Sequence, residues 1–500
     1  MTEFELKFEI PADRLHAVAA ALQKIKAKKQ RLLASYFDTP DACLTQRGIV
    51  VRVRKEGRRW VQTAKCPALG PLLRLEHNVN LSFTASTTDR SPRIDLSLHN
   101  GTAVGAAIAQ ALDLKKGKSM PELVRLYETD VERLTARVSH GTSTVEIALD
   151  QGRIVSGSQT LNLCEIEFEL KEGSPEDVVA LAQKWCADYG LWLSSITKSM
   201  KGQRLRGNTL FAPAVSAVLP KFDRKANGKE IFVAALESCL NQILPNASDL
   251  AGGSPDAHQI HQLRVGIRRL RTAMRDLEFL VGTADTAWEE PMVATFRALG
   301  RHRDASYLVP NLQALMKADG GPPVHFEGTV SSSLPSPQTV VRSPAFQDAL
   351  LSLIALAHSC RSDANSTGLS HKKAMKVLSS HLGKLHKNAL AGGKKFLSLD
   401  EHHQHDVRKR MKRLRYLAEF LAPLFQSSQT GVFVSGLKPP QDALGLYNDE
   451  IMGLKAYLEQ AEKDQAAWFG AGWLSARRLH NATACQKKLI RFAKIKPFWK

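Results

Sequence analysis

The 500-residue chain has few cysteines and lacks long apolar runs. Its seven cysteines are scattered and form no CxxC pair, which argues against a disulfide framework or a cysteine zinc site. No stretch approaches 18 uninterrupted apolar residues, and the opening Met-Thr-Glu-Phe-Glu-Leu-Lys places charge where a signal peptide needs an apolar core. We therefore expect a cytoplasmic protein without a membrane span.

Acidic residues are in the minority. The chain has 69 Lys and Arg against 49 Asp and Glu, a formal charge of +20. Residues 1–200 carry 27 basic and 24 acidic groups, a balance of +3, whereas residues 201–500 carry 42 and 25, a balance of +17. A length of about 150 residues per domain predicts two to four domains. The second part is expected to meet an anionic partner: nucleic acid, a membrane surface or another polyanion.

The first 200 residues contain short runs in which polar and apolar residues alternate, a pattern typical of strands. Glu3, Glu5 and Lys7 share one face, and a helix is predicted over residues 11–29. Further strand-like runs are residues 49–54, 60–65, 74–81, 126–137, 144–149, 154–156 and 164–171. Many strands at short spacing favour a largely antiparallel sheet or barrel.

The polar faces of these strands carry both signs of charge. Glu165, Glu167 and Glu169 share one face, and Arg52 and Arg54 share another. A solvated sheet face explains any one strand. Taken together, clustered carboxylates suit a hard cation such as Mg²⁺, and clustered Arg and Lys suit phosphate oxygens. The pattern therefore indicates metal–polyphosphate chemistry, and a closed barrel would supply a polar interior for it.

Ordered motifs in this part resemble the CYTH domain of the triphosphate tunnel metalloenzyme superfamily. The first is Glu3-Phe4-Glu5-Leu6-Lys7, which matches an ExExK signature. The others follow in the family's order: residues 36–39 (YFDT), 44–48 (LTQRG), 51–54 (VRVR), 60–65 (WVQTAK), 74–76 (RLE), 129–133 (TDVER), 149–152 (LDQG), 165–170 (EIEFEL) and 198–199 (KS).

The resemblance implies an antiparallel eight-stranded β tunnel that binds a triphosphate with Mg²⁺ or Mn²⁺. It also implies roles for individual residues. The metal-side carboxylates would be Glu3, Glu5, Asp150, Glu165 and Glu167. The groups holding phosphate oxygens would be Arg52, Arg54, Lys65, Arg74, Arg133 and Lys198. Lys7 would help to activate or position the attacking water, with Glu3 and Glu5 as its catalytic neighbours.

The remainder of the chain reads mostly helical and contains an internal repeat. Residues 261–271 (HQLRVGIRRLR) match residues 405–415 (HDVRKRMKRLR) at an offset of 144, and Leu299-Gly300 matches Leu444-Gly445 at an offset of 145. Two motifs at nearly the same offset indicate a duplicated helical unit. Residues 320–344, rich in Pro, Gly and Ser, are expected to connect its halves.

Each copy of the repeat carries a row of basic residues along one side of a helix. At about 100° per residue, the positions of each row fall on one face beside an apolar stripe. The rows are His261, Arg264, Arg268 and Arg271, and His405, Arg408, Lys412 and Arg415. A solvated face, nucleic-acid binding and a metal site at His402, His403 and His405 are alternatives; no familiar nucleic-acid motif or matching ligand set supports the last two.

These runs resemble the CHAD domain, a helical module rich in histidine and basic residues. The resemblance implies an all-α domain of two pseudo-symmetric four-helix bundles with a basic channel or surface that binds inorganic polyphosphate. From the duplicated basic rows we predict that the eight row residues bind it. We expect an α+β chain with a CYTH tunnel at 1–205, a linker at 206–224 and a CHAD domain at 225–495. The predicted function is a metal-dependent inorganic triphosphatase, without specific nucleic-acid or membrane binding. The alternatives are a non-catalytic polyphosphate-binding or targeting protein, and an enzyme for nucleoside or thiamine triphosphate, including an adenylate cyclase.

Overall fold

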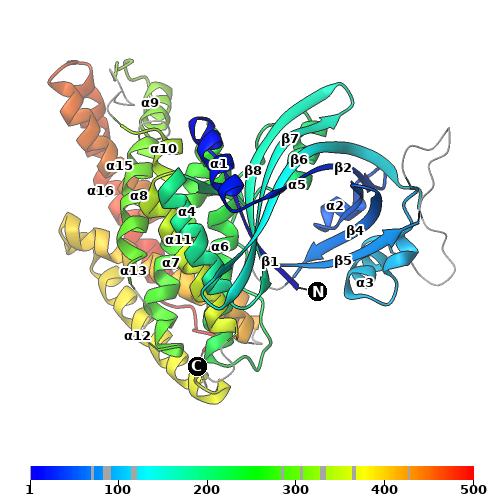
Figure 1. Ribbon diagram of the computed structural model, residues 1–500. Coiled ribbons are helices and arrows are strands. Elements are labelled where there is room, and N and C mark those ends of the chain that lie inside the picture. The colour runs from blue at the N-terminus through cyan, green and yellow to red at the C-terminus, as the bar shows by residue number, and fades with distance from the viewer. Residues whose placement is uncertain are drawn as a thin grey trace. The chain divides into compact units, whose positions relative to one another are not determined.

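The computed structural model describes residues 2–68, 73–82, 92–113, 121–282, 286–304, 308–326, 334–362, 368–425 and 428–499 (Figure 1). The chain divides into two compact units. The barrel unit comprises Met1–Ala214, Ala247–Ser254 and Val341–Ser359. The helical unit comprises Val215–Asn246, Pro255–Val340 and Cys360–Lys500. Two short segments from later in the chain thus join the barrel unit.

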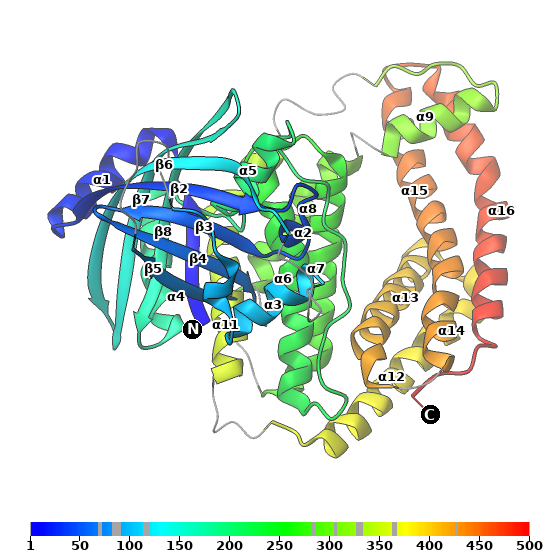
Figure 2. The same ribbon diagram turned by 90° about the vertical axis from the view of Figure 1, so that its right-hand side faces the viewer.

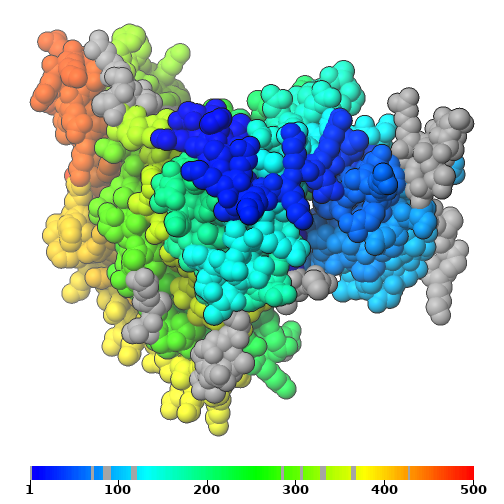
Figure 3. Space-filling model, viewed as in Figure 1, coloured from blue at the N-terminus to red at the C-terminus, as the bar shows by residue number. Residues whose placement is uncertain are grey.

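Eight antiparallel strands close into a barrel, as the sequence predicts. Their order is β5-β4-β3-β2-β6-β7-β8-β1, and β1 pairs back onto β5, with Glu3 opposite Arg74. The strands are β1 (Thr2–Glu9), β2 (Lys28–Asp38), β3 (Val50–Glu56), β4 (Arg59–Pro67), β5 (Leu73–Leu81), β6 (Val124–His140), β7 (Ser143–Ser156) and β8 (Gln159–Glu172). A short ninth strand, β9 (Trp192–Leu193), pairs with the outer part of β1. Figure 3 shows the residues of β1–β5 (blue) and β6–β8 (cyan) along the surface of this unit.

The apolar half of each alternating strand packs outward against helices. Leu6 and Phe8 are completely buried, and the Phe8 ring meets Phe168 edge-on with ring centroids 5.6 Å apart. Phe168 in turn contacts Trp185 of α4 (Pro175–Tyr189). This outer core leaves the opposite, polar faces of the strands to line the barrel interior.

Short helices complete the barrel unit. They are α1 (Leu15–Lys24), α2 (Cys43–Gln46), α3 (Ala103–Ala111) and α5 (Lys198–Arg206), with the 3₁₀ turns η1 (Ala12–Arg14) and η2 (Leu96–His99). The helix predicted over residues 11–29 is wrong at its C-terminal end. Lys26 has a left-handed φ of 57°, which ends the helix, and β2 already begins at Lys28.

The helical unit contains long helices that pack side by side (Figure 2). α12, α13, α15 and α16 form a closed ring of neighbours, and α7 packs against both α8 and α13. The helices are α6 (Gly228–Ala251), α7 (Ala257–Leu277), α8 (Glu289–Arg303), α9 (Val309–Ala318), α10 (Pro337–Val341), α11 (Pro344–Ser362), α12 (His371–Lys394), α13 (Glu401–Leu421), α14 (Ser428–Gly436), α15 (Lys438–Ala461) and α16 (Ala467–Phe492). α6 and α11 each contribute residues to both units.

The predicted connection at 320–344 contains α10, while residues 327–333 of that stretch lie outside the described residues. Among the residues that the structure describes, we find no helix with the length and apolarity needed to cross a bilayer.

Candidate functional site

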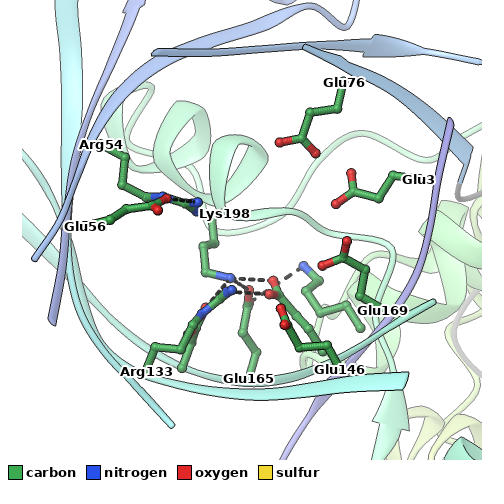
Figure 4. Close-up of polar contacts among 12 residues, drawn as sticks. Glu3, Arg54, Glu56, Glu76, Arg133, Glu146, Glu165, Glu169 and Lys198 are labelled. Atoms are coloured by element: carbon green, nitrogen blue, oxygen red, sulfur yellow. Dashed lines mark hydrogen bonds and ion pairs between the residues drawn. The ribbon is translucent and has the colours of Figure 1, made fainter. Parts of the chain in front are cut away.

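Strand register brings charged side chains of both signs to the barrel interior. Cross-strand partners point to the same side of a sheet. Lys7 lies opposite Glu167, and Arg133 lies opposite Asp150. Lys65 lies opposite Glu76. Figure 4 shows Glu3, Glu76, Arg54, Arg133 and Glu165 pointing inward from different strands. The alternation seen in the sequence therefore becomes a continuous charged lining.

Three carboxylates lie close together on the interior faces of β7 and β8. Asp150, Glu165 and Glu167 each offer an oxygen within 4.8 Å of the others, and Asp150 and Glu165 are completely buried. Lys198 Nζ, from α5, lies 2.7 Å from Asp150 Oδ2, 2.6 Å from Glu165 Oε1 and 2.5 Å from Glu167 Oε1. Arg133 adds a two-pronged contact to Asp150, with both N–O distances at 2.6 Å. We call these three residues the carboxylate cluster.

A second acidic group lies across the interior. Lys65 Nζ is 2.7 Å from Glu3 Oε2 and 2.8 Å from Glu76 Oε2. The charges of Glu167 in one group and of Glu3 and Lys65 in the other both act on Glu5. Burial, reinforced by the charge of Glu167, raises the pKa of the Glu5 carboxyl to about 8, although Lys65 opposes the shift. Of the five carboxylates expected at a metal, three are therefore together, Glu3 is apart with Lys65, and Glu5 faces both groups.

Lys7 is the buried amine whose hydrogen bonding is incomplete. Its Nζ lies 3.7 Å from Glu165 Oε2 and has no hydrogen-bond partner within the described ranges. Burial lowers the pKa of the Lys7 ammonium to about 8, against the attraction of Glu165. Burial alone would raise the pKa of Glu165, but Lys198, Lys7 and Lys201 hold it at about 2. This end of the interior therefore holds an ionised carboxylate beside an amine that can exchange a proton near neutral pH.

Arg52 and Arg54 of β3 lie across the barrel from the carboxylate cluster, which is on β7 and β8. Arg54 Nε donates to Glu56 at 2.7 Å. Arg52 Nη1 is 3.5 Å from the Tyr36 hydroxyl, and its buried Nε has no hydrogen-bond partner in the described part of the chain. Arg74 shares the inward face of Glu3 by register. These guanidinium groups present donors suited to phosphate oxygens.

In the helical unit, the two basic rows converge because α7 packs on α13. Burial, together with the charge of Arg268, lowers the pKa of Lys412 to about 5, the pKa of Arg264 to about 10 and the pKa of His261 to about 4; for His261 the charge of Arg303 also contributes. Arg408 shares this environment, and burial with Arg268 lowers its pKa to about 10. We call Arg264, Arg268, Arg408 and Lys412, with His261 beside them, the basic cluster.

Both parts of the chain match models of known protein families. A family model described as CYTH domain matches residues 1–202, and one described as CHAD domain matches residues 234–455. The chain contains a CYTH domain followed by a CHAD domain.

Individual related proteins share low sequence identity with this chain. A protein named inorganic triphosphatase from Haemophilus influenzae is 27% identical over 176 residues, which cover 34% of this chain and 45% of the relative. The match thus spans under half of that relative's length. Two solved structures are also similar. The CHAD domain of the plant Ricinus communis has 22% identity and a TM-score of 0.46, covering 56% of this chain and 96% of its own. A proposed adenylyl cyclase from Hippeastrum, described as having a dominant triphosphatase activity, has 19% identity and a TM-score of 0.30, covering 42% and 97%.

Not every residue of the two basic rows in the CHAD domain joins the basic cluster. Arg271 Nη2 is 2.9 Å from Glu289, and Arg415 Nε is 2.5 Å from Glu419, so each of these arginines already has a carboxylate partner. His405 Nδ1 lies 3.2 Å from Asn448 Oδ1. By contrast, the buried Nε atoms of Arg268 and Arg408 have no hydrogen-bond partner among described residues.

Sequence reasoning missed several charged groups of the CYTH interior. Glu76 and Glu56 have the same parity as Arg74 and Arg54, so strand alternation could have found them. Lys201 lies one turn after Lys198, and its Nζ is 2.6 Å from Glu165 and 2.7 Å from Glu9. In the CHAD domain, Arg303 and Asp449 both belong to the second matching motif of the repeat, and Arg303 Nη2 lies 3.4 Å from Asp449 Oδ2.

One further group has metal-ligand geometry. Asp400, His402 and His403 at the exposed start of α13 offer atoms within 4.8 Å of one another. His403 Nδ1 is already 2.8 Å from Asp400 Oδ1, and His405 is not part of the group. We assign no function to it.

Proposed function

We propose that the CYTH domain is a divalent-metal-dependent inorganic triphosphatase that hydrolyses triphosphate to pyrophosphate and phosphate. The observation that carries the proposal is the closed barrel interior, where the carboxylate cluster faces arginine and lysine side chains from other strands. A barrel interior lined by both signs of charge suits a highly charged anionic substrate together with its cation. The name of the Haemophilus relative supports the same activity.

The donor set fits Mg²⁺ or Mn²⁺. The carboxylate cluster offers only oxygen ligands, which hard cations prefer over softer metals. Asp150, Glu165 and Glu167 would hold the ion, with Glu3 and Glu5 on the same lining. When bound, such an ion neutralises phosphate charge and acidifies water.

The basic residues would bind the substrate. Arg52, Arg54, Arg74 and Lys65 would hold phosphate oxygens from one side, and Arg133 and Lys198 from the other. Ion pairs with interior carboxylates hold Lys65, Arg133 and Lys198 in the interior. Catalysis would come mainly from positioning and charge neutralisation of the in-line transition state.

Lys7 would orient the attacking water through its unpartnered Nζ. Water attacks the terminal phosphorus, the P–O bond to the adjacent phosphate breaks, and pyrophosphate leaves. The proton of the water passes to a nearby basic group or the bulk.

A panel of triphosphate, long-chain polyphosphate, ATP and thiamine triphosphate, assayed for phosphate release with Mg²⁺ and with Mn²⁺, tests the proposal. We expect metal-dependent release, fastest with triphosphate. Preference for ATP or thiamine triphosphate would favour that alternative substrate, and cyclic AMP formation would identify a cyclase. No turnover with any substrate would favour a non-catalytic binding protein.

We further propose that the CHAD domain binds inorganic polyphosphate through the basic cluster, with the CYTH domain over 1–205, a linker over 206–224 and the CHAD domain over 225–495. The support is the cluster of cations around Arg268, whose Nε is buried without a hydrogen-bond partner in the described residues. Adjacent like charges repel, and a bound polyanion would relieve that repulsion. His261 and His405 flank the site.

The binding test uses the full chain and two variants that each replace three basic side chains by Gln. The first changes Arg268, Arg408 and Lys412. The second changes Lys372, Lys376 and Lys384, which are exposed on α12. We expect the first to lose most affinity for labelled polyphosphate and the second to lose little. Equal losses, or equal displacement of the label by DNA at the same phosphate concentration, would indicate a general polyanion surface.

A further inference from the structure

Helix α5 presents both of its interior lysines from one short segment. Thr197 caps its start, accepting a hydrogen bond from the Met200 amide at 3.3 Å. Lys198 and Lys201 then reach three interior glutamates and Asp150. The position of α5 relative to the strands therefore sets how far both ammonium groups enter the barrel.

At Gly202, α5 packs directly against the ring of Tyr127 in the barrel wall. A Cβ added to this buried glycine would overlap the ring of Tyr127 on β6, with Cζ at 2.6 Å and two other ring carbons closer. Two carbons pack at about 3.5 Å, so any side chain here requires a shift of about 1 Å. The glycine thus allows an approach that alanine would prevent.

Tyr127 cannot easily move aside. Its ring stacks on Tyr36 with centroids 4.7 Å apart, and it is 3% exposed. Its hydroxyl donates to the Ser199 carbonyl of α5 at 3.1 Å. Gln203 Nε2 of the same helix donates to Thr45 Oγ1 at 2.8 Å, so the helix is held on either side of the glycine contact.

We propose that Gly202 and Tyr127 are positioning residues that fix the depth at which α5 presents Lys198 and Lys201 to the interior carboxylates. The consequence for turnover rests on the proposed triphosphatase function. The consequence for the two lysines does not, because it follows from packing alone. Gly202 and Tyr127 carry no charge, and neither is one of the five carboxylates or the basic residues of the interior.

Gly202→Ala is the first test, and Gly207→Ala is its matched control. Gly207 ends α5 with φ −79°, and a Cβ there would meet its nearest atom, Gln203 O, at an ordinary 3.5 Å. Alanine has a higher helix propensity than glycine, so this effect alone would stabilise α5 in either variant. We expect Gly202→Ala to raise the KM for triphosphate by about tenfold or more, because misplacement of about 1 Å can cost on the order of a hundredfold.

A readout independent of turnover is the rate at which an amine-acylating reagent labels Lys198 and Lys201, measured by mass spectrometry relative to exposed Lys24. We expect labelling of both lysines to accelerate several-fold in Gly202→Ala and to stay at the wild-type rate in Gly207→Ala. If the wild type releases no phosphate from triphosphate but the labelling changes as expected, the triphosphatase proposal fails and the positioning role stands.

A double-mutant cycle with Tyr127→Ala separates positioning from general destabilisation. Without the ring, the methyl group added at Gly202 has nothing to overlap, so it should cause no further change in labelling or KM. Tyr127→Val, whose side chain ends before the overlapping ring atoms, serves the same cycle if Tyr127→Ala does not fold. The proposal is overturned if Gly202→Ala behaves like Gly207→Ala, or if the methyl has the same effect with and without the ring.

Discussion

A carboxylate inside the barrel differs from one outside in the number of cations that face it. Glu167 contacts both Arg133 and Lys198 at 2.5 Å. Glu132, on the outer face, pairs with exposed Lys29 and with no other cation among the residues that the structure describes. Glu167→Gln should therefore lower metal-dependent kcat/KM by on the order of 10²-fold, because charge is lost where the cation and phosphates meet. Phosphate release across a Mg²⁺ titration measures this.

Glu132→Gln is the control, since it makes the same chemical change on the same barrel. We expect it to stay within about twofold of the wild type. A Glu167→Gln enzyme with normal turnover would place the metal elsewhere. Added chelator should abolish wild-type turnover and leave both proteins folded.

His99 should make the barrel unit sensitive to acid. His99 is fully buried. Gln62 Oε1 accepts a hydrogen bond from the Asp95 amide, so the Gln62 Nε2 group donates to His99 Nε2 at 3.0 Å. His99 Nε2 therefore acts as an acceptor and carries no proton. Burial, together with the charge of His77, lowers the pKa of His99 to about 4, although Asp95 opposes the shift. The unfolded imidazole, with a pKa near 6.5, binds its proton first.

Stability from neutral His99 is therefore complete above about pH 6.5 and is lost as the pH falls toward 4. The shift corresponds to at most about 3 kcal/mol. We expect the thermal midpoint of the barrel unit to fall between pH 7 and pH 4.5, and to fall less in His99→Leu. Replacing exposed His16 should not alter the difference; equal pH dependence in all three proteins would contradict the assignment.

At the scale of elements, one buried carboxylate ties three helices of the helical unit together. Asp276 of α7 is completely buried, accepts from Arg413 of α13 through both Nε and Nη2, and lies 2.9 Å from His381 Nε2 of α12. Asp276→Asn leaves Arg413 without its counter-charge at a partly buried position. The expected cost is about 3 kcal/mol, or a fall of roughly 5–10 °C in the melting of this unit.

Asp442→Asn, an identical change at an exposed position of α15, is the control and should melt like the wild type. Scanning calorimetry resolves the transitions. An unchanged midpoint in Asp276→Asn would mean that packing of α7, α12 and α13 does not depend on the ion pair.

Elements with a regular period could be predicted from the sequence, and their three-dimensional neighbours only in part. Alternation in residues 3–8 and 164–171 predicted which side chains line the barrel, and the strand number followed from the family resemblance. Lys201 was missed because α5 carries little amphipathic signal, and only the docking of Gly202 on Tyr127 directs its lysines inward. Arg271 and Arg415 fit the basic rows by spacing, yet Glu289 and Glu419 pair with them, and neither partner belongs to the repeated motif.

At the scale of the whole molecule, the duplicated rows meet in a site where protons and phosphate binding should be linked. Burial and the charges of Arg268 and Arg408 lower the pKa of Lys412 to about 5, with Asp449 as a weaker counter-charge. A polyanion would raise that pKa, so binding should take up a proton and strengthen as the pH falls from 8 toward 5.

Titration calorimetry in two buffers of different ionisation enthalpy measures the uptake. We expect a positive proton uptake at pH 7 in the wild type, which is reduced in Lys412→Met and retained in Lys384→Met on exposed α12. Binding without proton uptake in the wild type would contradict a neutral Lys412 in the free protein.

The barrel unit recruits two segments from far along the chain. Leu193 N donates to Gln347 Oε1 at 2.7 Å, Ser195 N donates to Ser248 Oγ at 2.9 Å, and Arg204 grips Asp249 with two hydrogen bonds. Gln347 lies on α11, while Ser248 and Asp249 lie on α6. None of these partners could be found from local sequence patterns, because each depends on where a distant helix packs.

Because α6 and α11 belong to both units, the chain cannot be divided into two complete fragments at one position. A fragment ending at residue 205 would lose the partners of Leu193, Ser195 and Arg204, and would uncover Trp192 and Phe4, which Arg342 and His358 cover in the whole chain. A fragment starting at residue 221 would carry the orphaned halves of α6 and α11. Neither fragment would have a complete surface. Because the barrel unit ends at Ser359, its last segment is made only after most of the helices have been synthesised, so the folding of the two units is linked along the chain.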